Sequence, residues 1–464
     1  PPSSGQPPAS PAPFLPGARS AGDRLFPSIG NGGYDVGHYD LELDYEPVTD
    51  TLLGEATIRA TATHNLSEFS LDFHGLTVSA VQVDGRDALH TRDGDKLIVT
   101  PPAGIPAGSA FTTTVAYGGT IVAYTDPDGS HEGWVPTPDG AFVVNEPVGA
   151  MSWFPNNNVP TDKALYDVKV TVPPGSTVFG NGRLVSHEGD TWHWREDRPM
   201  ATYLTTATNG AFVRQTDETD PAIPHEYGVD PAYGPAAVAI QQDLESSPAM
   251  TQFFADTLGS PYPFTSSGGV VDVSDVGYAL ESQTRPMYAL PPGVATIAHE
   301  IAHQWFGNSV SPATWSDIWL NEGPAEFYSW LWEERENGGT PTPELFTTHY
   351  EDSGFDWSIP PAQPPSAEDL FNTDAMYNRG AMVMEALRQI VGEERFLELC
   401  RAWLSEHAYG HASTADFIAL FRERGGVDRR QLDKFFREWL YTSYPSNGRS
   451  RPAITPENFG TYVG

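Results

Sequence analysis

The sequence predicts an α+β protein, in which an all-β domain is followed by a mainly helical domain with a small sheet. Two regions of the chain support this prediction. Apolar and polar residues alternate from about residue 34 to residue 205, which is the period of a half-buried strand. From about residue 293 onward, apolar residues recur every three or four positions, as in amphipathic helices. The length of 464 residues suits two or three domains.

The first half of the chain consists of short alternating runs separated by turn residues. Clear runs lie at residues 39–45, 56–62 and 166–172. Asp-Gly pairs, which favour tight turns between strands, occur at 84–85, 93–94 and 128–129. We expect a β domain of packed, twisted sheets over residues 26–207. Residues 1–25, rich in Pro, Ser, Ala and Gly, are expected to form a tail or linker.

The pattern changes after about residue 208. Residues 236–258 have helical spacing, and a break rich in Gly, Pro and Ser separates them from an apolar strand at 269–273. Further amphipathic helices are expected at 379–390, 393–404, 414–424 and 430–441. We assign residues 208–445 to the second domain, and residues 446–464 to a C-terminal surface tail.

Composition excludes several classes of protein. A formal net charge of −35 repels phosphate backbones, so nucleic acid is not an expected partner. No apolar run is long enough to span a bilayer. The single cysteine, Cys400, allows no intramolecular disulfide and is expected to be buried. Because the sequence begins with Pro1 and is acidic, we expect a processed, secreted monomer, with the cytoplasm as the alternative location.

A pair of histidines marks a candidate metal site. Residues 299–303 read His-Glu-Ile-Ala-His, so on a helix His299 and His303 lie one turn apart on the same face. Glu322 follows nineteen positions after His303 and opens a second helical run at residues 325–336, which can return its carboxylate to the imidazoles. By itself, the pentapeptide is equally compatible with two hydrogen-bonded core histidines.

Two nitrogens and one oxygen give zinc three protein ligands and leave one position open for water. An open site is catalytic in type, whereas structural zinc sites are closed and usually richer in cysteine. Glu300 neighbours a ligand and can point at the open position, where it would serve as the base for that water. The sequence therefore predicts one catalytic zinc ion.

The motif and its surroundings resemble the aminopeptidase N family of zinc metallopeptidases, the gluzincins. The resemblance rests on His-Glu-Ile-Ala-His-Gln-Trp-Phe-Gly-Asn at 299–308 and Trp-Leu-Asn-Glu-Gly at 319–323, and it extends over most of residues 30–445. It implies a thermolysin-like (zincin) fold for the second domain. It also implies that the chain is a short form, without the large C-terminal helical domain of longer members.

The resemblance also implies substrate contacts. The family's Gly-Ala-Met-Glu-Asn motif corresponds to residues 278–282, of which Ala279 and Glu281 are kept. Glu281 matches the residue that binds the substrate's free α-ammonium, and Ala279 and Leu280 accompany it. The departures at 278, 280 and 282 leave the preferred first side chain open.

Two more matches complete the expected site. Glu146, in Asn-Glu-Pro at 145–147, matches a second acid near the amine, and Tyr377 matches a tyrosine that stabilises the oxyanion. Together these residues imply an aminopeptidase that removes N-terminal residues from peptides. Two alternatives stay open: a zinc hydrolase of another specificity, such as an endopeptidase or epoxide hydrolase, and a non-catalytic peptide-binding module.

Overall fold

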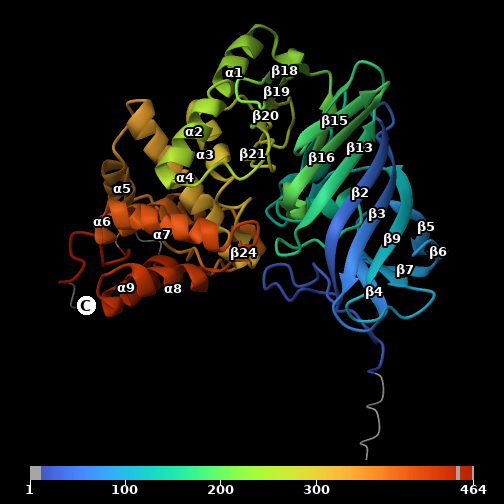
Figure 1. Cartoon of the computed structure of the whole chain (residues 1–464). Helices are drawn as coiled ribbons and strands as arrows, with labels where there is room; N and C mark the ends of the chain where they lie inside the picture. The colour runs from blue at the N-terminus through green and yellow to red at the C-terminus, as the bar shows by residue number, and fades with distance from the viewer. Residues whose placement is uncertain (1–11, 446–449, 462–464) are drawn as a thin grey trace, which may run out of the picture.

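The computed structural model describes residues 12–445 and 450–461. The β domain lies on the right in Figure 1 and the helical part of the second domain on the left, with strands β18–β21 near their junction. This arrangement confirms the predicted α+β class and the order of the two domains.

The β domain is built on one large sheet with strand order β15-β16-β13-β2-β3-β9-β5-β6. Along β2, Tyr39, Leu41, Leu43 and Tyr45 are buried and their neighbours face outward, as the alternating sequence predicts. The strands of this sheet are β2 (Tyr34–Glu46), β3 (Thr51–Ala62), β5 (Thr77–Val83), β6 (Arg86–Asp87), β9 (Ala110–Thr120), β13 (Ala164–Thr171), β15 (Arg183–Glu188) and β16 (Thr191–Met200).

Two smaller sheets cover the buried face of the large one. Tyr34 of β2 packs edge-on against Phe69 of β4 at 5.8 Å between ring centroids, and Tyr45 packs against Trp134 of β11 at 5.0 Å. All three sheets therefore share one aromatic-rich core. The first small sheet contains β1 (Leu15–Pro16), β4 (Leu66–Asp72), β7 (Leu89–Asp93) and β8 (Lys96–Thr100). The second contains β10 (Tyr124–Thr125), β11 (His131–Pro136), β12 (Ala141–Val144), β14 (Thr177–Gly180) and β17 (Ala207–Gly210).

The three Asp-Gly pairs lie at hairpin turns, as predicted. Gly85, Gly94 and Gly129 all have positive φ and join β5 to β6, β7 to β8 and β10 to β11.

The segment before β2 connects the two domains. Leu15 and Pro16 form β1, which pairs with β4, and Asp23 Oδ2 accepts a hydrogen bond of 2.9 Å from the backbone N–H of Trp315 in the second domain. The part of the expected N-terminal tail at residues 12–25 is therefore attached to the fold; the part at residues 1–11 lies outside the described residues.

The second domain begins with a five-stranded sheet in the order β18-β19-β20-β22-β21. Its short last strand, β21, runs antiparallel to β22 and forms the edge nearest the zinc motif. The strands are β18 (Val213–Asp217), β19 (His225–Val229), β20 (Ser267–Val271), β21 (Ala279–Leu280) and β22 (Met287–Tyr288). The helix predicted at 236–258 is two helices, because Ser246 and Pro248 mark a new start.

The remaining helices form the helical half, and the amphipathic runs predicted from the sequence all appear in it. Helix α4 begins at Trp319, so Pro324 lies inside it and the predicted start at 325 was six residues late. The helices are α1 (Ala237–Leu244), α2 (Ser247–Leu258), α3 (Val294–Ala302), α4 (Trp319–Glu336), α5 (Thr342–Glu351), α6 (Gly380–Val391), α7 (Glu393–Glu406), α8 (Thr414–Arg424) and α9 (Arg429–Phe436). A short pair of strands, β23 (Ser311–Pro312) and β24 (His411–Ala412), links this half to the loop after α3.

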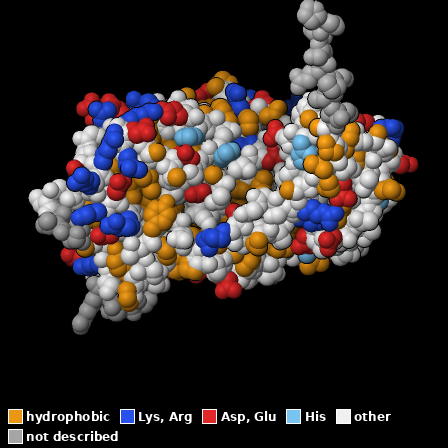
Figure 2. Space-filling model, turned by 90° about the horizontal axis from the view of Figure 1, so that it is seen from below, with side chains coloured by type: hydrophobic (Ala, Val, Ile, Leu, Met, Phe, Trp, Pro, Cys, Tyr) orange, Lys and Arg blue, Asp and Glu red, His pale blue; other side chains and the backbone are white. Residues whose placement is uncertain are grey.

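The described end of the chain packs on the helical half. Ile454 is fully buried, and its carbonyl accepts a hydrogen bond of 2.8 Å from Trp439 Nε1. Residues 450–461 are therefore not a free surface tail, whereas 446–449 and 462–464 lie outside the described residues. In Figure 2, Lys and Arg side chains gather over the helical half at the left of this face. Within the described ranges, none of the helices is long and apolar enough to cross a membrane.

Candidate active site

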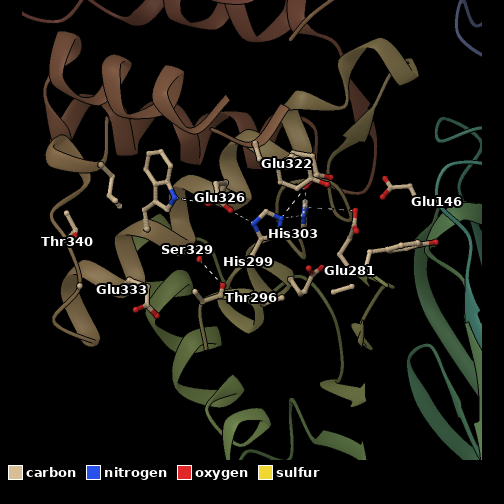
Figure 3. Close-up of a pocket in the computed structure, with 18 residues that line it drawn as sticks. Glu146, Glu281, Thr296, His299, His303, Glu322, Glu326, Ser329, Glu333 and Thr340 are labelled. Atoms are coloured by element: carbon tan, nitrogen blue, oxygen red, sulfur yellow. Dashed lines mark hydrogen bonds and ion pairs between the residues drawn. The ribbon is translucent and has the colours of Figure 1, made fainter. Parts of the chain in front are cut away.

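The three predicted zinc ligands meet at one point in the cleft between α3 and α4 (Figure 3). His299 lies in the last turn of α3, His303 directly follows that helix, and Glu322 lies in the first turn of α4. The two Nε2 atoms are 3.0 Å apart, and Glu322 Oε2 lies 3.2 Å from that of His299 and 3.3 Å from that of His303. The structure therefore brings together the three residues that the sequence predicts as zinc ligands.

These distances fit a zinc ion. Ligand atoms at about 2.0–2.1 Å from a tetrahedral zinc lie about 3.3 Å from one another, and the three observed separations are close to that value. The hydrogen-bond partners of the outer nitrogens also favour metal binding. His299 Nδ1 lies 3.0 Å from Glu326 Oε2, and His303 Nδ1 lies 3.0 Å from the Phe306 carbonyl. Because both partners can only accept, each Nδ1 carries the proton and each Nε2 offers its lone pair to the metal.

Glu326 supports His299 and was not predicted from the sequence. It lies one helical turn after Glu322 on α4, and Trp330 Nε1 donates to its other oxygen at 2.7 Å. Its carboxylate lies four residues after a predicted ligand, on the same face of the helix, and this spacing is the feature of the sequence that could have identified it.

The charges around the ligands favour a cation. Burial alone would raise the pKa of Glu322, but the two imidazoles outweigh it and hold the pKa at about 2. Burial would likewise lower the pKa of His303, but Glu281 and Glu322 raise it to about 9. The carboxylates of Glu146, Glu300 and Glu326 line the same cleft. A bound divalent ion would therefore balance an excess of negative charge.

Glu300 has the properties of a general base. Its side chain lines the cleft beside His299, and burial raises its pKa to about 7 against the opposing effect of the imidazoles. A carboxylate whose pKa is near neutral can both accept and return a proton. This is the role that the sequence predicted for it.

The amine-binding candidates come from different domains and lie close to the predicted metal ligands. Glu281 follows the edge strand β21, and Glu146 comes from the β domain (Figure 3). Ligand oxygens of Glu146, Glu281 and Glu322 all lie within 4.8 Å of one another. One oxygen each of Glu146 and Glu281 is buried without a hydrogen-bond partner, so the pair has free acceptors for an ammonium group.

Ala279 and Leu280, the other two predicted substrate contacts in the edge-strand motif, point to opposite sides of the strand. Ala279 lines the cleft beside Glu281. Leu280 is 1% exposed and its side chain packs in the core, so only its backbone is available to a substrate. The alternation of the strand explains the difference, because neighbouring side chains leave it on opposite faces.

Tyr377 stands over the metal ligands in a π-helical turn, Thr373–Arg379, just before α6. Its ring stacks on that of His299, with centroids 5.7 Å apart, and it lines the same cleft of about 730 Å³. Burial raises the pKa of its hydroxyl well above the usual value, so the group stays protonated and can donate. The close approach of Gly323 to Gly380, where an added Cβ would lie 2.7 Å from a backbone atom, brings this turn onto α4.

Contacts between the domains hold the loop after Glu281, and none of them was predicted. Asn181 Nδ2 donates to the Gln283 carbonyl at 2.7 Å, and Arg285 donates to the Gly182 carbonyl at 3.1 Å. On the other side, Asn308 Nδ2 donates to the Glu281 carbonyl at 2.7 Å. The loop that carries Glu281 is therefore held by both the β domain and the loop that follows the His299–His303 motif.

Comparisons with known proteins agree with this architecture. Residues 36–204 match the peptidase M1 N-terminal domain, and residues 269–439 match the peptidase family M1 domain. Aminopeptidase N of Streptomyces lividans is 26% identical over 449 residues, covering 88% of this chain and 50% of the relative. Endoplasmic reticulum aminopeptidase 1 of Homo sapiens is 23% identical over 428 residues, covering 82% of this chain and 44% of the relative. The chain thus spans about half the length of the curated relatives it matches.

Solved structures of similar extent also match. A two-domain M1 zinc metallopeptidase variant bound to L-arginine superposes with a TM-score of 0.82 at 27% identity, covering 94% of this chain and 100% of that one. A variant of the M1 zinc metallopeptidase from Deinococcus radiodurans, bound to a Tyr-Ser-Ala substrate, gives 0.79 at 27% identity, covering 92% and 99%. These structures share both domains with the present chain.

Proposed function

We propose that this chain, which belongs to peptidase family M1, is a zinc-dependent aminopeptidase that removes the first residue from peptides with a free α-amine. The observation that carries the proposal is the placement of two carboxylates with free acceptors, Glu146 and Glu281, directly beside the predicted zinc ligands. A peptide whose ammonium group is held there has its first peptide bond, and no later one, at the metal.

The chain's own residues account for the proton movements of hydrolysis. His299, His303 and Glu322 would hold the zinc ion, which would supply Lewis acidity to the cleft. Glu300 accepts a proton as a water molecule attacks the carbonyl carbon, and returns it to the leaving nitrogen as the C–N bond breaks. The Tyr377 hydroxyl donates a hydrogen bond to the carbonyl oxygen as negative charge develops on it.

The arrangement also bears on the two alternatives. An endopeptidase or epoxide hydrolase does not require a pair of free carboxylates at the end of the cleft. A module that only binds peptides requires neither a buried base beside the metal site nor a hydroxyl group opposite it. Glu300 and Tyr377 line the same cleft as the amine-binding pair, which favours hydrolysis of the first peptide bond.

The test compares matched substrates on the zinc-loaded protein. We expect hydrolysis of leucyl and lysyl peptides, little or no hydrolysis of the same peptides after N-acetylation, and loss of activity on chelation that returns with added zinc. Equal cleavage of free and acetylated peptides would contradict the aminopeptidase assignment, and full activity after exhaustive chelation would contradict the metal assignment.

A further inference from the structure

A second cavity opens off the main cleft where the substrate's first side chain would lie. It has a volume of about 230 Å³ and shares Glu146, Tyr278, Ala279 and Tyr377 with the cleft. Its remaining lining residues, Asp128, Ser130, Phe371 and Thr373, belong to the β10–β11 hairpin and to the segment before Tyr377. A residue whose amine is held by Glu146 and Glu281 has this cavity within reach of its side chain.

Two carboxylates line this cavity, Asp128 at the hairpin tip and Glu146. Two more acids belong to the same hairpin: Asp126 is 3% exposed and Glu132 is fully buried. Both oxygens of Asp126 are buried without a hydrogen-bond partner, which is unusual for a carboxylate because an unpaired buried charge is costly.

The described residues supply no cation to balance this charge, since no lysine or arginine among them forms an ion pair with any of the four acids. Burial, together with the charge of Asp128, raises the pKa of Asp126 to about 7. The pKa of Glu132 is raised well above its usual value by burial and by Asp126. A positive group entering the cavity would relieve this repulsion.

Tyr278 lines the cavity together with Asp128 and Glu146. Its hydroxyl donates a hydrogen bond of 2.9 Å to the His131 carbonyl, which ties the edge of the catalytic sheet to the hairpin. After burial, the charges of Glu132, Glu146, Asp126 and Asp128 all raise the pKa of this hydroxyl. Tyr278 lines the cavity, and the face of an aromatic ring can stabilise a cation. Tyrosine at this position is also where the chain departs from the glycine of the family motif.

We propose that this cavity selects substrates whose first residue is lysine or arginine, with the cationic end held at Asp128 against the face of Tyr278. The proposal rests on the proposed function, because it needs the α-amine at Glu146 and Glu281. It assigns the acidic hairpin Asp126–Glu132 to substrate selection rather than to hydrolysis.

The test uses lysyl and norleucyl coumarinamides, whose side chains differ only in the terminal ammonium group. We expect the wild type to favour the lysyl substrate in kcat/KM, and Asp128→Asn to lower the lysyl-to-norleucyl ratio about tenfold. The matched control is Glu188→Gln, an exposed acid on another turn of the β domain, which should leave the ratio unchanged. Added salt should lower the wild-type ratio, because exposed charges are screened.

A binding measurement separates this inference from the proposed function. The thermal shift produced by L-lysine should exceed that produced by L-norleucine in the wild type, and the difference should shrink in Asp128→Asn. A wild-type ratio of one or less, or a ratio that Asp128→Asn leaves unchanged, would overturn the proposal. Absence of hydrolysis for every substrate would overturn the proposed function, and the L-lysine measurement would then decide on the cavity alone.

Discussion

Gly323 and Gly380 meet backbone to backbone where α4 crosses α6: a Cβ added to Gly380 would lie 2.7 Å from the Cα of Gly323. Gly323 directly follows Glu322, a predicted metal ligand, and Gly380 comes three residues after Tyr377. The crossing therefore sets the distance between a predicted metal ligand and the predicted oxyanion donor.

Gly380→Ala is expected to push the two helices apart. Overpacking of this kind lowers the free energy of unfolding by about 1–3 kcal/mol. The displacement of Tyr377 should lower kcat by a larger factor than it raises KM. Denaturant unfolding and steady-state kinetics measure the two effects. Gly37→Ala is the control, because its nearest neighbour would be 3.8 Å from the new Cβ. An unchanged Tm and kcat in Gly380→Ala would show that the crossing is looser than described.

Glu300→Gln is expected to retain zinc and to lose about two to four decades of kcat, because a carboxamide cannot accept the proton of the attacking water. Metal content by elemental analysis and turnover of a leucyl peptide are the two measurements. Turnover near that of the wild type, or loss of the metal, would count against Glu300 as the base.

Glu281→Gln is expected to raise KM for free-amine peptides about 10- to 100-fold, since it replaces a charge-assisted contact with a neutral one. Hydrolysis of N-acetylated peptides, already slow, should change little. Kinetics with paired free and acetylated substrates provide the comparison. An equal loss on both would assign Glu281 to the structure of the edge strand instead.

Glu326→Ala is expected to weaken zinc binding about 10- to 100-fold, since His299 loses the acceptor that fixes its ring and tautomer. Glu326→Gln keeps an acceptor oxygen and should lose less. Competition with a chelator of known affinity measures the change, and Glu336→Ala, an exposed acid at the end of the same helix, is the control. Identical zinc affinities in all three variants would exclude a supporting role for Glu326.

We expect the free energy of unfolding to depend on pH because of Asp272, which directly follows β20. Burial first, and then the neighbouring Asp230, raise its pKa in the folded state to about 8. Because the folded form binds the proton more tightly than the unfolded form, the stabilisation is present at low pH and is lost as pH rises through about 8. Asp272→Asn should therefore reduce the loss of unfolding free energy between pH 5.5 and pH 8.5. The exposed Asp275→Asn should not, and equal slopes in both variants would refute the assignment.

The sequence alone was sufficient to predict the candidate site residues whose relative positions follow from their spacing along the chain. His299 and His303 lie one helical turn apart, and the length of the following loop predicted the return of Glu322. Pro324 misplaced the start of α4, because a proline usually marks a helix boundary, yet here the helix continues through it. The contacts of Asn181 and Arg285 join residues about a hundred positions apart, and no periodicity in the sequence reports such pairs.

Glu326 and the acidic hairpin were missed for different reasons. Glu326 has the right helical spacing, but only the ring orientation of His299 shows that it is a partner. Asp128-Gly129 was read only as a turn, and it is one. The proposed second role of Asp128, in substrate selection, depends on Tyr278 of the other domain. The Tyr278 hydroxyl donates a hydrogen bond to the carbonyl of His131, which lies in the same hairpin as Asp128.

Glu146 and the hairpin come from the β domain, whereas the metal ligands, Glu300 and Tyr377 come from the helical domain. The predicted metal ligands, Glu300 and Tyr377 are thus encoded in one stretch of the gene, whereas the proposed selectivity is shared between the hairpin and Tyr278 of the second domain. A recombinant that keeps residues 208–445 and exchanges the 126–132 hairpin should therefore keep the hydrolytic chemistry of one parent and change only the part of the substrate preference that the hairpin contributes. In such a lineage, new specificities can arise without any change to the metal centre.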